Sequence, residues 1–261
     1  MGKFDGILLA TDWDGTFFHN NRLFDENLKA IKYFVDNGGY FTVCSGRYPK
    51  FLKQYAETVH INTYAVCYNG ALIVDLYNDR VLYESFCDSV LFDIIDMLFS
   101  SEAKYKTINV HMNDGSDVID LTIEEFCKLK DFFKTKSIYK VLLKAENPID
   151  AENGVRIANE LDLCGYIAVR SWDISLEILK RENAKGASLR RIADEIGAKL
   201  VVAVGDYEND IDLIRAADIG YAVQNAIGTL KDVADRITVD VTEAAIAHII
   251  YDLERDINNN H

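Results

Sequence analysis

The sequence contains only two prolines among 261 residues, and it has no long apolar run. No segment approaches the roughly 20 consecutive apolar residues of a membrane-spanning helix, so we expect no membrane anchor. The apolar run closest to the N-terminus, Ile7 to Ala10, lies between Asp5 and Asp12, and it is too short and too acidic for a secretory signal peptide. We therefore expect a cytoplasmic protein.

Basic residues are few: 28 Lys and Arg stand against 42 Asp and Glu, which gives a net charge of −14. Nucleic acids and anionic membrane surfaces attract clusters of Lys and Arg, so this composition argues against both as partners. A small anionic substrate is still compatible, because a metal ion and local cations can outweigh the global charge. The five cysteines form no Cys-x-x-Cys pair, which suits buried thiols in a reducing compartment.

Short apolar strands alternate with helical patterns at both ends of the chain. In the first part, strands are expected near 7–11, 40–44 and 64–68, with helices between them; near the C-terminus the same alternation returns from residue 185 onward. Alternation of this kind implies parallel strands joined by right-handed crossovers. We therefore predict an α/β fold with a doubly wound parallel sheet, formed by residues 1–85 and 182–261.

The segment between these two parts, residues 86–181, has a different rhythm. Helical patterns near 88–99 and 122–134 are interspersed with short strand-like runs, and no regular βαβ alternation is present. We expect this segment to form an α+β domain that is inserted into the α/β core.

Three of the expected core strands run into polar residues. The first strand leads into Asp12, the second into Ser45, and the strand at 200–205 into Asp206. In an open parallel sheet, ligands bind outside the carboxyl ends of the strands. Each ending alone is also compatible with an ordinary turn, but the three together predict one shared site.

The first ending reads Asp12-Trp13-Asp14-Gly15-Thr16. Two carboxylates so close together repel each other unless they share a cation or a proton. A calcium-binding EF-hand loop is excluded, because its sixth position would be Phe17 rather than Gly and its twelfth Leu23 rather than Glu. A simple Asp-Gly turn stays open as an alternative.

The other polar segments fit a site for a metal ion and an anion. Carboxylates from two strand ends, those of Asp12 and Asp206, together with a main-chain carbonyl would make a hard oxygen site of the kind that suits Mg²⁺. Ser45-Gly46-Arg47 offers a hydroxyl and backbone N–H groups near a helix start, which can cradle an anion. Lys185 stands at the start of another expected helix, where it is also compatible with a surface charge.

Five motifs occur in a fixed order: Asp-x-Asp-Gly-Thr at 12–16, Ser-Gly-Arg at 45–47, Asn-Gly-Ala at 69–71, Lys-Gly at 185–186 and Gly-Asp-x-x-Asn-Asp at 205–210. With this set, the chain resembles the haloacid dehalogenase-like (HAD) superfamily, and more narrowly the Cof-type (class IIB) sugar-phosphate phosphatases. Their large cap domain is inserted after the third core strand, where this chain has its insert. One departure is Trp13, because aliphatic residues are commoner between the two aspartates; we expect its side chain to pack away from the site.

The resemblance implies a role for each motif residue. Asp12 would be the nucleophile that forms an aspartyl-phosphate, and Asp14 would protonate the leaving alcohol and then activate water. Mg²⁺ would be held by Asp12, the main-chain carbonyl of Asp14, and Asp206. The remaining positions are the phosphate ligands Ser45, Gly46, Lys185 and Asn209, and the supporting residues Asp210, Arg47 and Asn69.

The function that the resemblance implies is an Mg²⁺-dependent phosphatase for small phosphorylated metabolites, above all sugar phosphates. Two alternatives stay open: a phosphomutase of the mannomutase-like branch, and a non-catalytic phosphate-binding protein on the same scaffold. The presence of both Asp12 and Asp14 argues against the second alternative, because binding alone does not require the second aspartate. Nothing in the sequence selects one substrate or an oligomeric state.

Overall fold

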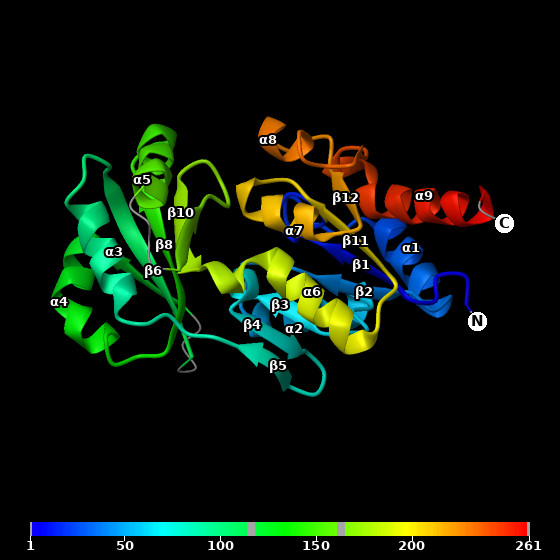
Figure 1. Ribbon diagram of the computed structural model, residues 1–261, viewed down its shortest axis with the longest axis horizontal. Helices are drawn as coiled ribbons and strands as arrows, with labels where there is room; N and C mark the ends of the chain where they lie inside the picture. Colours follow the sequence, from blue (N-terminus) through cyan, green and yellow to red (C-terminus); the bar gives the residue numbers. More distant parts are fainter. Residues whose placement is uncertain (1, 114–117, 161–164, 260–261) are drawn as a thin grey trace. The chain divides into compact units, whose positions relative to one another are not determined.

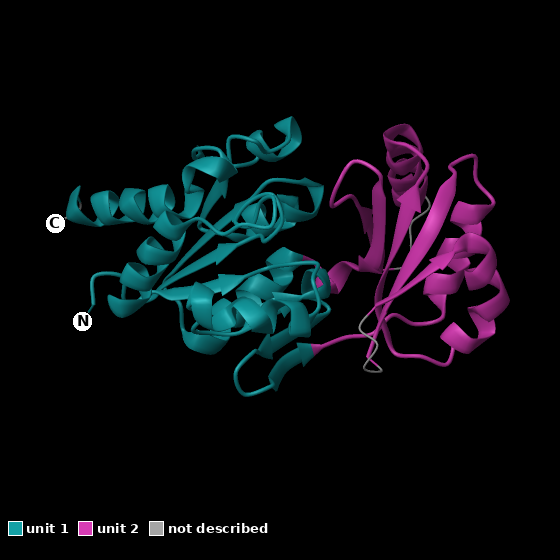
Figure 2. Ribbon diagram, turned by 180° about the vertical axis from the view of Figure 1, so that it is seen from behind, with its two compact units in different colours: residues 1–83, 185–261 teal, residues 84–184 magenta. Residues whose placement is uncertain are grey.

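A computed structural model describes residues 2–113, 118–160 and 165–259, which form two compact units (Figures 1 and 2). Unit 1 comprises residues 1–83 and 185–261, and unit 2 comprises residues 84–184. The α/β class and the parallel core sheet predicted from the sequence are confirmed. No helix in the described ranges combines the length and apolarity that a membrane crossing requires.

Unit 1 is built around a five-stranded sheet in the order β13-β12-β11-β1-β2, and every neighbouring pair in it is parallel. Its strands and helices are β1 (Ile7–Thr11), α1 (Asp25–Asp36), β2 (Tyr40–Val43), α2 (Pro49–Val59), β3 (Ala65–Cys67), η1 (Tyr68–Gly70), β4 (Leu72–Asp75), β5 (Arg80–Glu84), α6 (Lys185–Ile196), β11 (Leu200–Gly205), η3 (Glu208–Asp210), α7 (Ile211–Ala216), β12 (Ile219–Ala222), α8 (Gly228–Lys231), β13 (Arg236–Ile237), η4 (Val241–Glu243) and α9 (Ala245–Asn259).

The adjacent strands β1 and β11 explain why the sheet is wound in both directions. The chain passes from β1 to β2 on one side of the sheet order and from β11 to β12 on the other. Because such crossovers are right-handed, α1 and α7 cover opposite faces of the sheet; α9 packs with α1, and α6 packs with α7. All five residues of β1 are buried, as expected of a strand covered on both faces.

A smaller antiparallel sheet of unit 1 contains β3, β4 and β5 in that order. A single parallel bridge between Cys44 and Val66 joins it to the end of β2. The last strand, β5, ends at Glu84, where unit 2 begins. The chain leaves the core there and re-enters it at Lys185, the first residue of α6.

Unit 2 has a five-stranded sheet in the order β7-β6-β8-β10-β9, and its neighbouring strands are antiparallel. Three helices in the part of unit 2 that the structure describes pack against the sheet. The elements of unit 2 are α3 (Val90–Phe99), β6 (Tyr105–Met112), β7 (Val118–Thr122), α4 (Ile123–Phe133), β8 (Ile138–Ala145), α5 (Pro148–Glu160), β9 (Tyr166–Val169), β10 (Ser175–Lys180) and η2 (Arg181–Asn183).

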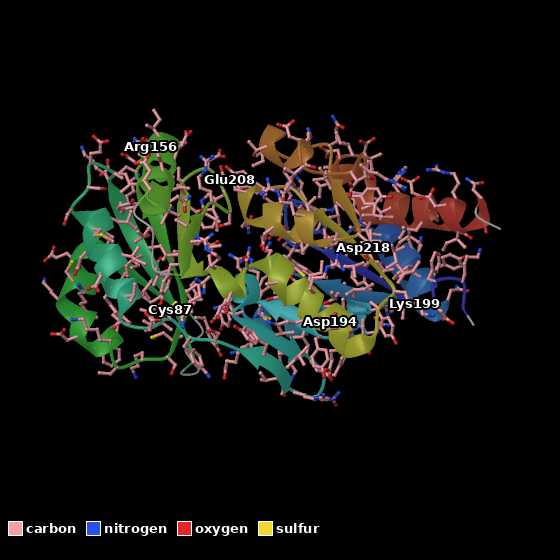
Figure 3. All side chains as sticks on the ribbon, in the orientation of Figure 1. Cys87, Arg156, Asp194, Lys199, Glu208 and Asp218 are labelled. Carbon is pink, nitrogen blue, oxygen red and sulfur yellow. The ribbon has the colours of Figure 1, made fainter. Side chains whose placement is uncertain are left out.

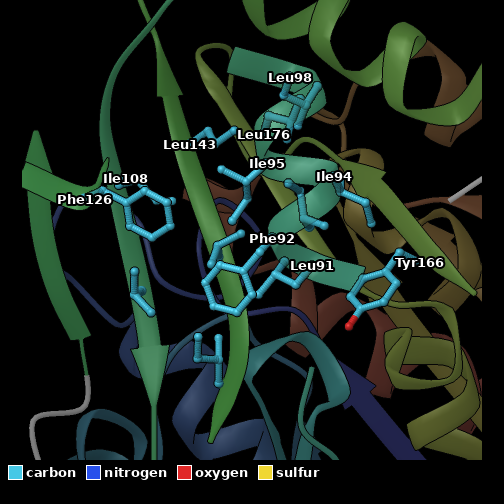
Figure 4. Close-up of a cluster of buried hydrophobic side chains, with 14 of the residues drawn as sticks. Leu91, Phe92, Ile94, Ile95, Leu98, Ile108, Phe126, Leu143, Tyr166 and Leu176 are labelled. Carbon is cyan, nitrogen blue, oxygen red and sulfur yellow. The ribbon is translucent and has the colours of Figure 1, made fainter. Parts of the chain in front are cut away.

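The core of unit 2 forms where α3 meets the sheet (Figure 4). Apolar residues alternate along the strands, so that Ile108, Leu143 and Leu176 point toward the helices. The intervening residues include Lys140 and Glu177, which form a buried ion pair on β8 and β10. Unit 2 therefore has a hydrophobic core of its own, as an independent domain requires.

Candidate active site

The polar residues that follow β1, β2 and β11 lie at the same edge of the parallel sheet. These three strands are neighbours in the order β11-β1-β2. Their pairing continues past the strand ends: the N–H of Asp12 donates to the carbonyl of Val204 (2.9 Å), and the N–H of Cys44 donates to the carbonyl of Thr11 (2.8 Å). The register therefore brings Asp12, Ser45 and Asp206 to one edge, although they are far apart in the sequence.

Lys185 is the charged centre of this site. Its Nζ donates to Oδ1 of Asp12 and to Oδ1 of Asp210, both at 2.6 Å. The Lys185 side chain is fully buried, and burial opposes its charge, but the two carboxylates outweigh that effect and raise its pKa above the ordinary value. A helix N-terminus is unfavourable for a cation, so this lysine is held there by the two carboxylates.

Asp206 is fixed by the loop that carries the two aspartates of the first motif. The hydroxyl of Thr16 donates to Oδ1 of Asp206 at 2.9 Å. Gly15 has a φ of +85°, and a Cβ at this position would lie 2.4 Å from Oδ2 of Asp206. Gly15 is thus required twice, by its backbone conformation and by the close approach of the carboxylate.

Asp12, Asp206 and Asp210 each offer a carboxylate oxygen, and these oxygens lie within 4.8 Å of one another. Burial, and next the charge of Asp210, raise the pKa of Asp12 well above its usual range. The same two causes raise the pKa of Asp206 to about 7. The site therefore holds more negative charge than the single Lys185 can neutralise.

This donor set fits a hard divalent cation. When ionised, the three carboxylates carry two more negative charges than the one ammonium group of Lys185 can balance in this buried place. Mg²⁺ prefers carboxylate and carbonyl oxygens, and it would supply the missing charge. The sequence assigned Asp12 and Asp206 as ligands and Asp210 as a supporting residue, and the structure brings the carboxylates of all three together.

The side chain of Asp14 lies in a different place. Its two oxygens accept hydrogen bonds from Arg47, at 2.8 Å from Nε and 2.7 Å from Nη2. Its carboxylate is therefore not part of the acidic group formed by Asp12, Asp206 and Asp210. Trp13 between the two aspartates is fully buried and packs against aromatic rings, as predicted.

The loop after β2 presents Ser45 and Gly46 beside Arg47. Ser45 is buried, and its Oγ accepts a hydrogen bond from the N–H of Arg47 at 3.1 Å. The carbonyl of Ser45 accepts from the N–H of Asn69, which lies in η1 with a φ of +58°. Asn69 thus supports the Ser45 loop through its main chain.

The half-buried Asn209 belongs to η3, the turn that follows β11 and is marked by Glu208 in Figure 3. Asp210 ends this turn, and its Oδ2 accepts hydrogen bonds from the N–H groups of Asp206 (3.1 Å) and Tyr207 (3.4 Å). The Asp210 carboxylate therefore both shapes the turn and binds Lys185.

Three residues with clear roles at the site were not assigned from the sequence. Thr16 binds Asp206; Asp212 accepts a hydrogen bond from the N–H of Gly186 at 2.7 Å, at the start of α6; and Asn225 donates to the carbonyl of Gly15 at 2.9 Å. Thr16 lies inside the first motif, but its partner Asp206 lies 190 residues further along the chain. Only the folded structure shows these contacts.

A family model described as haloacid dehalogenase-like hydrolase matches residues 9–250. The chain is 27% identical over 256 residues to the 5-amino-6-(5-phospho-D-ribitylamino)uracil phosphatase YcsE of Bacillus subtilis (strain 168), covering 93% of this chain and 94% of YcsE. Among solved structures it is similar to a haloacid dehalogenase-like hydrolase from B. subtilis (TM-score 0.80, 23% identity, 94% and 98% of the two chains). The HAD subclass IIB sugar phosphatase BT4131 is similar too (TM-score 0.74, 17% identity, 94% and 98%). These two structural likenesses concern the fold alone.

The ion pairs of Lys185 lead to a first prediction. Lys185→Met leaves Asp12 and Asp210 buried without their cation, so we expect the free energy of unfolding to fall by about 3–5 kcal/mol. The exposed Lys32, which pairs with Asp36, provides a matched control in Lys32→Met, with a change of less than about 1 kcal/mol. Urea unfolding measures both. The double variant Lys185→Met/Asp210→Asn should regain part of the loss, and equal stability of the two single variants would contradict the assignment.

A second prediction concerns Gly15. Gly15→Ala and Gly197→Ala both place a Cβ on a residue with positive φ (+85° and +66°), which costs about 1–2 kcal/mol in either case. Only at Gly15 does the new Cβ meet Asp206; at Gly197 it meets open space. We therefore expect Gly15→Ala to lose the rise in melting temperature that Mg²⁺ produces, whereas Gly197→Ala keeps it. Loss of this effect in both variants, or in neither, would refute the proposed cause.

The raised pKa of Asp206 predicts how metal binding depends on pH. Without a cation, the stability that protonated Asp206 provides is fully present below its ordinary pKa of 3.8 and is lost as the pH rises through about 7. A divalent cation binds the ionised form, so Mg²⁺ should raise the melting temperature more at about pH 8 than at about pH 5. Melting curves with Mg²⁺ and with EDTA measure this, and Asp206→Asn is the control in which the difference should shrink. An equal increase at both pH values would count against the site.

Proposed function

The chain belongs to the haloacid dehalogenase-like hydrolase family, and from this premise we propose that it is an Mg²⁺-dependent phosphatase that acts through an aspartyl-phosphate on Asp12. The single observation that carries the proposal is the buried contact of 2.6 Å between Lys185 and Asp12, within a group of three carboxylates. It combines a carboxylate nucleophile with one ammonium group, and the three carboxylates could hold a cation that supplies the further positive charge that a phosphoryl group requires.

In the first step, a carboxylate oxygen of Asp12 attacks the phosphorus atom of the substrate. The new O–P bond forms as the bond from phosphorus to the leaving oxygen breaks. The Asp14 carboxyl group donates its proton to that oxygen, which departs as an alcohol. Lys185, bound to Oδ1 of Asp12, holds the carboxylate in place and stabilises its charge before the attack.

In the second step, water hydrolyses the acyl phosphate. Asp14, now ionised, removes a proton from the water as its oxygen attacks phosphorus. The bond from phosphorus to Asp12 breaks, so that inorganic phosphate is released and the Asp12 carboxylate is restored. One residue thus serves first as acid and then as base, which splits one difficult displacement into two easier ones.

Mg²⁺ would be held by Asp12, Asp206 and the main-chain carbonyl of Asp14, and Asp210 would support this arrangement. The chemistry that it supplies when bound is neutralisation of the charge on the phosphoryl oxygens. Ser45, Gly46 and Asn209 would donate hydrogen bonds to the same oxygens, and Lys185 would face them from the buried side. Positioning and charge neutralisation are what phosphoryl transfer mainly demands.

We further propose that the substrate is the phosphomonoester of a small polyhydroxylated molecule, such as a sugar phosphate. Two proteins similar to this chain support that class by their names, a sugar phosphatase and a phosphatase for a phosphorylated ribitylamino compound. In both names the phosphate belongs to a hydroxylated carbon chain. The choice within this class falls to the residues that contact the rest of the molecule.

Phosphate release tests the proposed function. We expect inorganic phosphate to be released from one or more members of a panel of sugar phosphates, nucleotides and pyridoxal phosphate, in the presence of Mg²⁺ and not of EDTA. Asp12→Asn should abolish the release, since an amide cannot replace the nucleophile. Borohydride reduction during turnover, followed by mass spectrometry, should convert Asp12 to homoserine, as reduction of an acyl phosphate does.

The outcomes separate the competing functions. No release from any substrate, combined with interconversion of sugar phosphates in the presence of a bisphosphate, would indicate a phosphomutase. Binding of phosphate without either reaction would indicate a non-catalytic protein. Release that persists in Asp12→Asn would exclude Asp12 as the nucleophile.

A further inference from the structure

Arg47 binds the side chain of Asp14 in a geometry that is more specific than an ordinary surface ion pair. Nε and Nη2 of the guanidinium group face the two carboxylate oxygens, at 2.8 and 2.7 Å. Such a parallel pair of charge-assisted hydrogen bonds fixes the plane and the direction of the carboxylate as well as its position. A lysine could make one such contact but could not fix the plane.

Arg47 is itself held from two sides. Its main chain is tied to the loop, because its N–H donates to Oγ of Ser45 (3.1 Å) and its carbonyl accepts from the N–H of Tyr68 (3.0 Å). Its guanidinium group lies over the ring of Phe51, 4.6 Å from the centroid. Both constraints act before any substrate arrives, so the direction of the guanidinium group is set by the protein.

The ring of Phe51 in turn packs against other aromatic rings. It packs edge-on against Trp13, with ring centroids 6.1 Å apart, and it also contacts Tyr55 at 5.6 Å. Trp13 is fully buried and immediately precedes Asp14 in the chain. A ring of contacts therefore links Asp14 to Arg47, Arg47 to Phe51 and Phe51 to Trp13. The main chain joins Trp13 to Asp14.

Stability alone does not account for this arrangement. The side chains of Arg47 and Asp14 are 43% and 48% exposed, and ion pairs at such exposure contribute little to folding. The contact with Arg47 also restricts rotation of the Asp14 side chain, and this effect does not depend on burial. Such restriction matters where a group must meet a reacting atom within a few tenths of an ångström.

We propose that Arg47 is a positioning residue for Asp14, and that Phe51 orients Arg47 for this task. The inference rests on the proposed function, in which Asp14 exchanges a proton with the leaving oxygen and with water. The two aspartates then have one cation each: Lys185 holds the nucleophile Asp12, and Arg47 directs Asp14. A direct contact between Arg47 and the substrate is the competing role, and it predicts different kinetics.

Two substrates of similar shape separate these roles. Phenyl phosphate has a poor leaving group that needs a proton, whereas p-nitrophenyl phosphate has a good one that does not. We expect Arg47→Ala to lower the single-turnover rate of the first step, measured as release of the leaving phenol, by about 10–100-fold for phenyl phosphate and by less than about threefold for p-nitrophenyl phosphate, with little change in KM. Hydrolysis of the aspartyl-phosphate is common to both substrates and does not contribute to this rate. Arg47→Lys should restore part of the loss, and Phe51→Leu should cause a smaller loss of the same kind.

The double variant Arg47→Ala/Asp14→Asn gives the second readout. If Arg47 acts through Asp14, this double variant should be no slower than Asp14→Asn alone. Arg80→Ala is a matched control, because Arg80 also pairs with a carboxylate (Glu195, 3.1 Å) and lies over a ring (Tyr64, 5.6 Å) but stands outside the site. It should leave both rates unchanged.

Three results would overturn the inference: an equal loss of the first-step rate on both substrates, an increase in KM alone, and additive losses in the double variant. The last two would assign Arg47 to direct substrate contact. Failure of the proposed function would look different, because the unaltered protein would then release no phosphate from either substrate or Asp12→Asn would stay active. An active protein in which Arg47→Ala behaves like Arg80→Ala refutes only the role of Arg47.

Discussion

The ion pairs that Lys185 makes with Asp12 and Asp210 are the constraint on which the rest of unit 1 depends. The three side chains are almost completely buried and come from α6, the end of β1 and η3. A charge in that position without its partner would be strongly destabilising, so the three elements must come together in one arrangement. Lys185 is also the first residue of unit 1 after unit 2. Its ion pair with Asp12 therefore connects the two sequence segments of unit 1 at the residue where the chain re-enters this unit.

The overall charge of the protein and its proposed substrate are reconciled at this site. A chain with a net charge of −14 has no general attraction for phosphate. The acidic group formed by Asp12, Asp206 and Asp210 makes the site still more negative and therefore suits a divalent cation. With that cation bound, the net charge of the site would become more positive, which would favour binding of an anion. In the proposed function, the acidic residues would thus serve phosphate binding indirectly.

The two aspartates of the first motif are held by different physical means. Asp12 is buried with an ammonium group, where the low dielectric strengthens the charge interaction. Asp14 is half exposed and is directed by a planar guanidinium group supported by an aromatic ring. A nucleophile benefits from a fixed charge, whereas a group that exchanges protons with water needs access to solvent. The difference in burial fits the two tasks that we propose for these aspartates.

The sequence by itself determined the order of strands and helices, the insertion of an α+β segment, and the polar residues at three strand ends. Those features follow from local patterns in the sequence. The spacing of apolar residues separates helices from strands, and short continuous apolar runs indicate buried strands. The sequence could not show that Asp14 binds Arg47, 33 residues away, or that Thr16 binds Asp206 across 190 residues. Such contacts exist only after β11, β1 and β2 align in register, because hydrogen bonds depend on distances that no local pattern encodes. The tertiary structure therefore decided how the site residues are paired.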